Sequence, residues 1–178
     1  MKTRRIITIA VLAAISVVLV ALIHFPIFPA AAFLEYDPAD IPIFIGTFAF
    51  GPVAGIILTV IASVIQGVTV SAASGIIGIA MHIIATGVFV LVAGNIYRKN
   101  KTLKGAIISL VAGVVAMTAA MALWNIIVTP IYMGVETEVV LGMLWPVIIP
   151  FNLIKAGINA VITFFLYKRL SKFLKKQS

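Results

Sequence analysis

The sequence contains no cysteine, five acidic residues and two histidines among its 178 residues. The missing cysteines exclude disulfide bonds and thiolate metal sites. The histidines, His24 and His82, are far apart in the chain, and no acid stands between Asp40 and Glu136. We therefore predict neither a metal centre nor paired carboxylates for acid–base catalysis. Because the chain also lacks a Gly-x-x-x-x-Gly-Lys-Ser/Thr motif for ATP, we expect no enzyme and no resident cofactor.

Apolar residues, in contrast, make up 63% of the chain, charged residues make up 10%, and the mean hydropathy is +1.24. These values are far from those of soluble domains and indicate an integral membrane protein. At roughly 20 residues for each crossing, the chain is long enough for about five or six transmembrane helices. We therefore expect a single all-α membrane domain over residues 1–178. The net charge of +8 comes from basic clusters beside apolar segments. Such clusters report membrane topology, so nucleic acid is not an expected partner.

The long apolar stretch after Asp40 has two interpretations, which the basic residues distinguish. A single helix over 41–64 would give three crossings before the basic loop of residues 98–104, whereas a break at Gly51-Pro52 gives four. Basic loops lie on the cytoplasmic side together with the basic N-terminus, which requires an even number. The break is therefore favoured, although it leaves a short second helix that needs a thinned bilayer or shelter by neighbouring helices.

With this break, we predict six transmembrane helices and both termini in the cytoplasm. Every Lys and Arg except Lys155 then falls inside, and all five acids fall outside. The segment 25–37 forms an outer loop whose prolines oppose a regular helix. The predicted spans are approximately residues 6–24, 38–50, 52–69, 75–97, 105–128 and 146–169.

Lys155 is the exception, because it lies inside the last apolar segment, and ionisable residues within membrane segments are functional-site candidates. Asn152, Lys155 and Asn159 are spaced three and four apart and share one helix face. Asn125 lies near the outer end of the preceding span, at a similar depth to Asn152 and Lys155. Together they suit the edge of a flat heterocycle. Alternatively, the amides join helices and Lys155 reaches the outer surface.

Aromatic and small residues extend this pattern. Trp124 stands beside Asn125, and either lines the same site or belongs to an interfacial aromatic belt. Ala10-x-x-x-Ala14 and Gly51-x-x-x-Gly55 have the spacing that lets helices approach closely. Each motif predicts either packing inside the bundle or a docking face for another membrane subunit.

These residues together resemble a known family. The sequence from Leu34 to Pro42, the Phe50-Gly51-Pro52-x-x-Gly55 turn, Ala10-x-x-x-Ala14, Asn125 and Asn152-x-x-Lys155 are similar to the S-components of energy-coupling factor (ECF) vitamin transporters, in particular the riboflavin-binding type. The resemblance covers the whole chain.

The resemblance implies an S-component of the prokaryotic plasma membrane that binds riboflavin outside the cell. It would deliver riboflavin inward with a transmembrane coupling subunit and two cytoplasmic ATPases. Ala10 and Ala14 would face the coupling subunit, while Asn125, Asn152 and Lys155 would hydrogen-bond the isoalloxazine edge. The loop from Phe33 to Asp37 would close over the ligand; its members are Phe33, Leu34, Glu35, Tyr36 and Asp37.

Because riboflavin is uncharged, Lys155 would act as a hydrogen-bond donor and need no carboxylate within the spans. Flavin mononucleotide is the second ligand considered, but the sequence offers no evident basic residue for its phosphate. Asn159 does not match the family motif, so its place on the site face is inferred from spacing alone. The alternatives are an S-component for another vitamin and a non-transporting membrane protein whose polar face packs helices or binds a partner.

Overall fold

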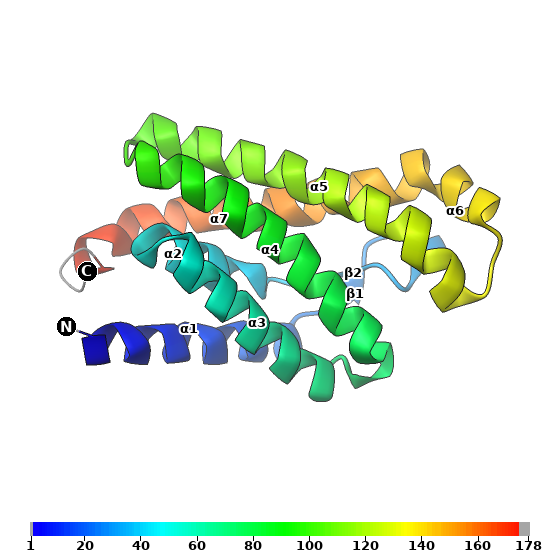
Figure 1. The fold of residues 1–178 in the computed structure, drawn as a ribbon, viewed down its shortest axis with the longest axis horizontal. Helices are drawn as coiled ribbons and strands as arrows, with labels where there is room; N and C mark the ends of the chain where they lie inside the picture. Colours follow the sequence, from blue (N-terminus) through cyan, green and yellow to red (C-terminus); the bar gives the residue numbers. More distant parts are fainter. Residues whose placement is uncertain (1, 175–178) are drawn as a thin grey trace.

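The structure, a computed structural model, describes residues 2–174 as a bundle of long helices with a minimal β-ladder (Figure 1). Its helical elements, in chain order, are α1 (Lys2–Leu22), η1 (Pro29–Ala31), α2 (Asp40–Phe50), α3 (Pro52–Val68), η2 (Ala72–Ser74), α4 (Gly75–Lys99), α5 (Leu103–Met133), α6 (Thr137–Met143), the π-helical turn η3 (Leu144–Ile148) and α7 (Ile149–Leu174). The strands β1 (Phe25–Pro26) and β2 (Glu35–Tyr36) pair antiparallel, with Phe25 opposite Tyr36.

Within residues 2–174, four helical segments are long and apolar enough to cross a membrane: Thr3–Leu22, Ala72–Lys99, Leu103–Met133 and Thr137–Arg169. The helices α2 and α3 are apolar but shorter. The start of α1, the end of α7 and the α4–α5 connection lie at one end of the bundle, whereas β1, β2 and α6 lie toward the other (Figure 1). The basic α4–α5 connection therefore shares its end of the bundle with the start of α1 and the end of α7.

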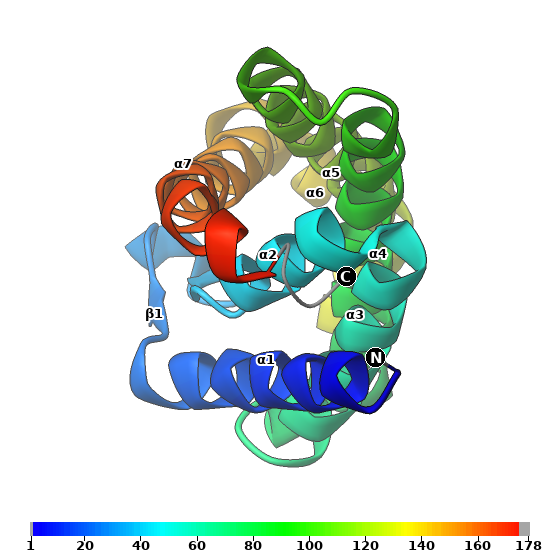
Figure 2. The ribbon, with the colours of Figure 1, turned by 90° about the vertical axis from the view of Figure 1, so that its left-hand side faces the viewer.

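The chain turns back between α2 and α3 at Gly51, where the sequence predicts a helix break. Gly51 has a φ of 91°, which L side chains rarely adopt, and Pro52 fits the first turn of α3 because it needs no helix donor there. With 11 residues, α2 is only about 16 Å long at 1.5 Å per residue. It lies in the middle of the bundle (Figure 2), and Ile43 and Phe44 are fully buried. Neighbouring helices thus shelter the short helix.

The core around α2 is built from close aromatic and small-residue contacts. Phe44 stacks on Phe89 of α4, with ring centroids 3.6 Å apart. At Gly55 of α3, an added Cβ would lie 2.1 Å from the Thr47 side chain and 2.5 Å from Val90. Gly55 therefore permits the close approach of α2, α3 and α4, and its motif serves packing within the chain.

Two helix ends differ from the sequence-based ranges because proline is tolerated inside a helix there. The helix α5 continues past the expected end at residue 128 and contains Pro130, with a left-handed cap at Gly134 one turn later. The last helical segment begins at Thr137, well before 146, and passes through η3. Pro146, which lacks an N–H donor, lies inside the π-helical turn η3, and Pro150 lies in the first turn of α7, where no such donor is needed.

Candidate ligand-binding site

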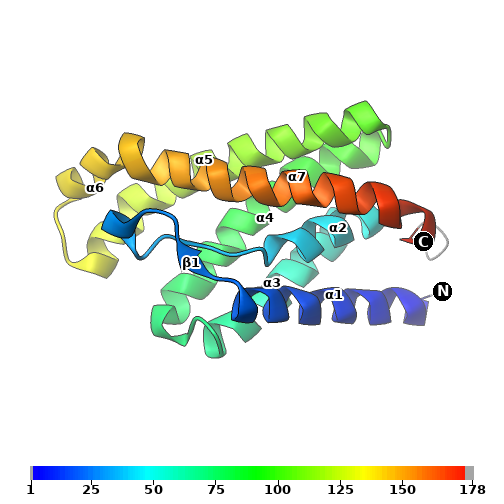
Figure 3. The same ribbon diagram turned by 180° about the vertical axis from the view of Figure 1, so that it is seen from behind.

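Lys155 of α7 is bound to the loop of residues 23–37, which we call the covering loop. Its Nζ donates to Asp37 Oδ2 at 2.6 Å and to the Glu35 carbonyl at 3.1 Å. Both side chains of the ion pair are 14% exposed. Lys155 thus has a carboxylate partner, Asp37, which lies in the predicted outer loop 25–37 and outside the predicted spans. The acid comes from the covering loop. This loop leaves the end of α1, passes through β1 toward α7 and then leads into α2 (Figure 3).

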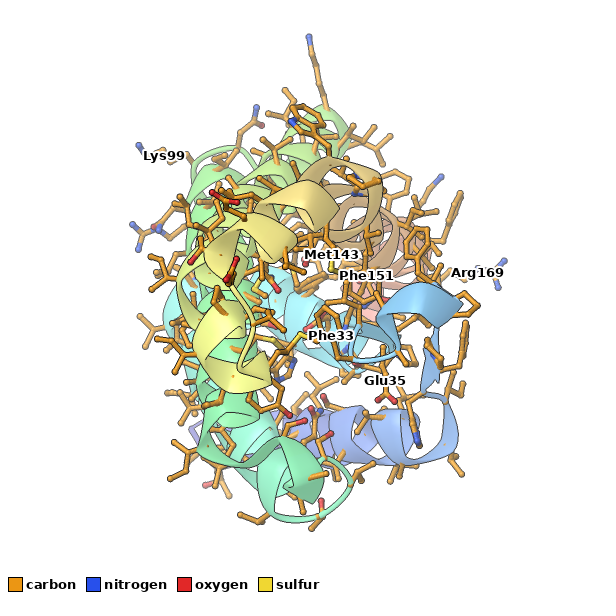
Figure 4. All side chains as sticks on the ribbon, turned by 90° about the vertical axis from the view of Figure 1, so that its right-hand side faces the viewer. Phe33, Glu35, Lys99, Met143, Phe151 and Arg169 are labelled. Carbon is orange, nitrogen blue, oxygen red and sulfur yellow. The ribbon has the colours of Figure 1, made fainter. Side chains whose placement is uncertain are left out.

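A cavity of about 350 Å³ lies beside this ion pair. It is bounded by the covering loop, the end of α3, η2, the start of α4, the end of α5 and α7. Its size falls in the range of small-molecule sites. Figure 4 looks onto this end of the bundle, where Phe33 lies near the middle. Of the residues predicted from sequence, the cavity brings together Phe33, Leu34, Glu35, Asp37, Trp124, Asn125 and Lys155.

Asn125 of α5 is held by its own helix. Its side-chain Nδ2 donates to the Met121 carbonyl at 2.7 Å, and its Oδ1 accepts a hydrogen bond from Thr129 Oγ1 at 2.8 Å. The residue is 2% exposed. Since an amide carries two N–H groups and two acceptor lone pairs, these bonds use half its capacity. A fixed, partly occupied amide at a cavity wall is suited to orient a polar ligand edge.

Asn152 lies in the same helix as Lys155 but outside the set of residues that line this cavity. It is 4% exposed, and its Nδ2 donates to the Ile148 carbonyl at 2.8 Å. Its neighbour Phe151 belongs to a small core with Leu34 and Val140, which anchors the covering loop against α6 and α7. A role for Asn152 in ligand binding stays a prediction.

Asn159, one turn further along α7, holds the covering loop in place by hydrogen bonds. It is fully buried, and its Nδ2 donates to the Asp37 carbonyl at 3.1 Å and to Asp40 Oδ2 at 3.4 Å. Its Oδ1 accepts from the Tyr36 hydroxyl at 3.1 Å. Burial first, and then the Asp37 charge, raises the pKa of the Tyr36 phenol, which stays protonated and can donate. Both amide atoms of Asn159 therefore have protein partners.

Asp40 is the centre of a buried polar network that sequence reasoning missed. The carboxylate is fully buried, accepts from Thr86 Oγ1 at 2.7 Å and lies 3.2 Å from His82 Nε2. The other ring nitrogen of His82 is 2.8 Å from Ser63 Oγ. His82 therefore contacts polar side chains of α2 and α3, which the sequence did not predict, because α2, α3 and α4 converge here. Its spacing of four from Thr86 was the available sequence signal.

Ala10 and Ala14 lie on an exposed face of α1, away from the cavity. Val11 and Val18 on this face are 50% and 53% exposed. By contrast, Ala13 and Ser16 face inward, and Ser16 Oγ donates to the Ala39 carbonyl at 2.6 Å. The small-residue motif is thus left uncovered by the chain's own described helices.

Comparisons with known proteins agree on one family. Residues 4–167 match the model of the ECF transporter substrate-specific component. The riboflavin transporter FmnP of Bacillus subtilis is 28% identical, with 99% of this chain and 97% of FmnP covered. The riboflavin transporter RibU of Staphylococcus aureus is 31% identical, with 98% and 94% covered.

A solved structure extends this agreement to the fold. The S component of a bacterial ECF transporter superposes with a TM-score of 0.83 at 34% identity, covering 98% of this chain and 99% of the other. Together with the long apolar helices, these relatives indicate a multi-pass protein of the bacterial cell membrane. The chain belongs to the family of ECF transporter substrate-specific components.

Proposed function

We propose that this protein is the riboflavin-binding subunit of an ECF-type importer, which captures riboflavin outside the cell. The observation that carries the proposal is the cavity where Lys155, Asn125 and Trp124 meet the covering loop. Relatives named riboflavin transporters, similar over nearly their whole length, support this ligand.

The charges around the cavity suit a neutral flavin. Lys155 enters the site already paired with Asp37, so its ammonium presents N–H donors without a large uncompensated charge. The amide of Asn125 and the face of Trp124 supply hydrogen bonding and stacking for a flat ring. A phosphate would bring further negative charge close to Glu35 and Asp37, which also line the cavity. Riboflavin is therefore favoured over flavin mononucleotide.

Delivery to the cytoplasm requires energy, which we assign to separate subunits. The exposed Ala10 and Ala14 on α1 provide a small-residue face for a transmembrane coupling subunit. Two cytoplasmic ATPases would act through that subunit.

We further propose that all of α1, α2, α3, α4, α5 and the long helix ending in α7 cross the membrane, with both termini in the cytoplasm. Basic residues at the end of the bundle where α1 begins, α7 ends and α4 connects to α5 support this orientation (Figure 1). Lys175 and Lys176, which contribute to the same argument, lie outside the described residues. The cavity is then open toward the outer side.

A tag inserted after Lys101, in the α4–α5 connection, is expected to be inaccessible to a membrane-impermeant label in intact cells, because this connection lies in the cytoplasm. The same tag placed after Gly134, between α5 and α6, serves as the outside control. Labelling at Lys101 in intact cells would refute the proposed six-span topology.

Riboflavin binding is expected to quench the protein's tryptophan fluorescence. Trp124 lines the cavity, whereas Trp145 is 77% exposed. A riboflavin titration of the detergent-purified protein should thus show saturable quenching, most of which is lost in a Trp124→Phe variant. Equal quenching in that variant would place the ligand away from Trp124, and no saturable quenching in the wild type would count against riboflavin as the ligand.

A further inference from the structure

The cavity has two chemically different walls. The side formed by α5 and α7 presents Trp124, Asn125 and Lys155, which suit an aromatic ring with polar edges. The side formed by α3, η2 and the start of α4 presents hydroxyl, amide and imidazole groups of Ser63, Gln66, Ser71, Ser74 and His82. A ligand with a flat ring and a hydroxylated chain matches both walls at once.

Gln66 is distinctive on the second wall because its amide nitrogen is buried without a partner. The residue is 6% exposed, and Nε2 has no hydrogen-bond partner among the residues that the structure describes. The nearby Ser63 hydroxyl, by comparison, donates to the Thr59 carbonyl and contacts His82. Buried donors in folded proteins nearly always have a partner. An amide of this kind at a cavity wall is poised to bind a group that enters the cavity.

The backbone at Gln66 is held by hydrogen bonds at the end of α3. The residue lies in the last turn of α3, and its carbonyl accepts hydrogen bonds from the Thr69 N–H at 3.2 Å and the Ser71 N–H at 2.8 Å. These bonds close the C-terminal end of the helix. The amide is therefore carried by the end of α3, whereas Asn125 reaches the same cavity from α5.

We propose that Gln66 is a specificity-determining residue that hydrogen-bonds the hydroxylated ribityl chain of the flavin, beside Ser63 and His82. This inference rests on the proposed function. An amide both donates and accepts, as a hydroxyl does, so the two groups are complementary. A site built to bind hydroxyl groups discriminates against an analogue that lacks them, because its buried polar groups are then left unpaired.

The test compares riboflavin with lumiflavin, which has the same ring but carries a methyl group in place of the ribityl chain. Equilibrium binding of both ligands is measured with wild-type protein and with Gln66→Leu, which removes the amide at similar size. We expect Gln66→Leu to weaken riboflavin binding by about tenfold or more and to change lumiflavin binding by less than about twofold. The wild type should prefer riboflavin, and the variant should lose most of that preference.

A matched control and a second variant keep the outcome decisive. Asn95→Leu replaces an exposed amide far from the cavity and should leave both affinities unchanged. If Gln66→Leu does not fold, Gln66→Met provides the same comparison. Unchanged riboflavin affinity, or an equal loss for both ligands, would overturn the role of Gln66 while leaving the proposed function intact. Wild-type protein that binds neither flavin would overturn both.

Discussion

Replacing Lys155 with alanine is expected to weaken riboflavin binding by more than tenfold, which corresponds to about 1.4 kcal/mol or more. The substitution removes a charged hydrogen-bond donor at the cavity wall. It also leaves the Asp37 carboxylate without its partner at 2.6 Å and releases the Glu35 carbonyl. The covering loop thus loses its ionic attachment to α7. Isothermal titration of riboflavin into detergent-purified protein measures the effect.

Two further variants accompany Lys155→Ala: a control, and a variant that separates direct ligand binding by Lys155 from its ion pair with the covering loop. Lys104→Ala removes an exposed lysine from the opposite end of the bundle and should leave the affinity unchanged. Asp37→Asn keeps an acceptor for Lys155 but removes the ion pair, and we expect a smaller loss than for Lys155→Ala. Unchanged affinity in Lys155→Ala would remove Lys155 from the site. An equal loss in Asp37→Asn would instead assign its effect to loop attachment.

Replacing Asn159 with alanine is expected to lower the free energy of unfolding by about 2–4 kcal/mol, because three buried or half-buried polar groups lose a partner. These groups are the Tyr36 hydroxyl, the Asp37 carbonyl and the Asp40 carboxylate. Since two of them belong to the covering loop, riboflavin should also dissociate faster. Thermal unfolding without ligand and stopped-flow dissociation measure the two effects.

Asn95→Ala is the matched control for Asn159→Ala, because Asn95 makes one exposed contact with its own helix at Leu91. It should unfold at the wild-type temperature. If Asn159→Ala retains wild-type stability and the wild-type dissociation rate, Asn159 does not hold the covering loop in place.

The sequence was sufficient for those features that follow from local chemistry. Gly51-Pro52 marks the break between α2 and α3 because a positive φ and a missing N–H both have local signatures. The basic loop near Lys101 requires an even number of crossings before it, which favours the break at Gly51-Pro52. Helix ends at prolines were less predictable. Pro130 lies inside α5 and Pro146 inside η3, so a proline alone did not mark these helix ends.

The polar contacts within the bundle could not be predicted in the same way. The spacing of Asn152, Lys155 and Asn159 places them near one helix face. It does not show that Lys155 pairs with Asp37 or that Asn159 accepts a hydrogen bond from Tyr36. These contacts join residues about 120 positions apart and depend on how the covering loop crosses α7. The Asp40–His82 contact likewise depends on the packing of α2 against α4.

The most direct measurement of riboflavin binding is the absorption spectrum of protein purified from riboflavin-containing cells, combined with equilibrium dialysis against riboflavin. We expect the detergent-purified protein to carry a flavin spectrum and, after removal of the flavin, to rebind riboflavin in an equimolar ratio. A correctly folded preparation that is colourless and retains no riboflavin in dialysis would contradict the proposal that this cavity binds riboflavin.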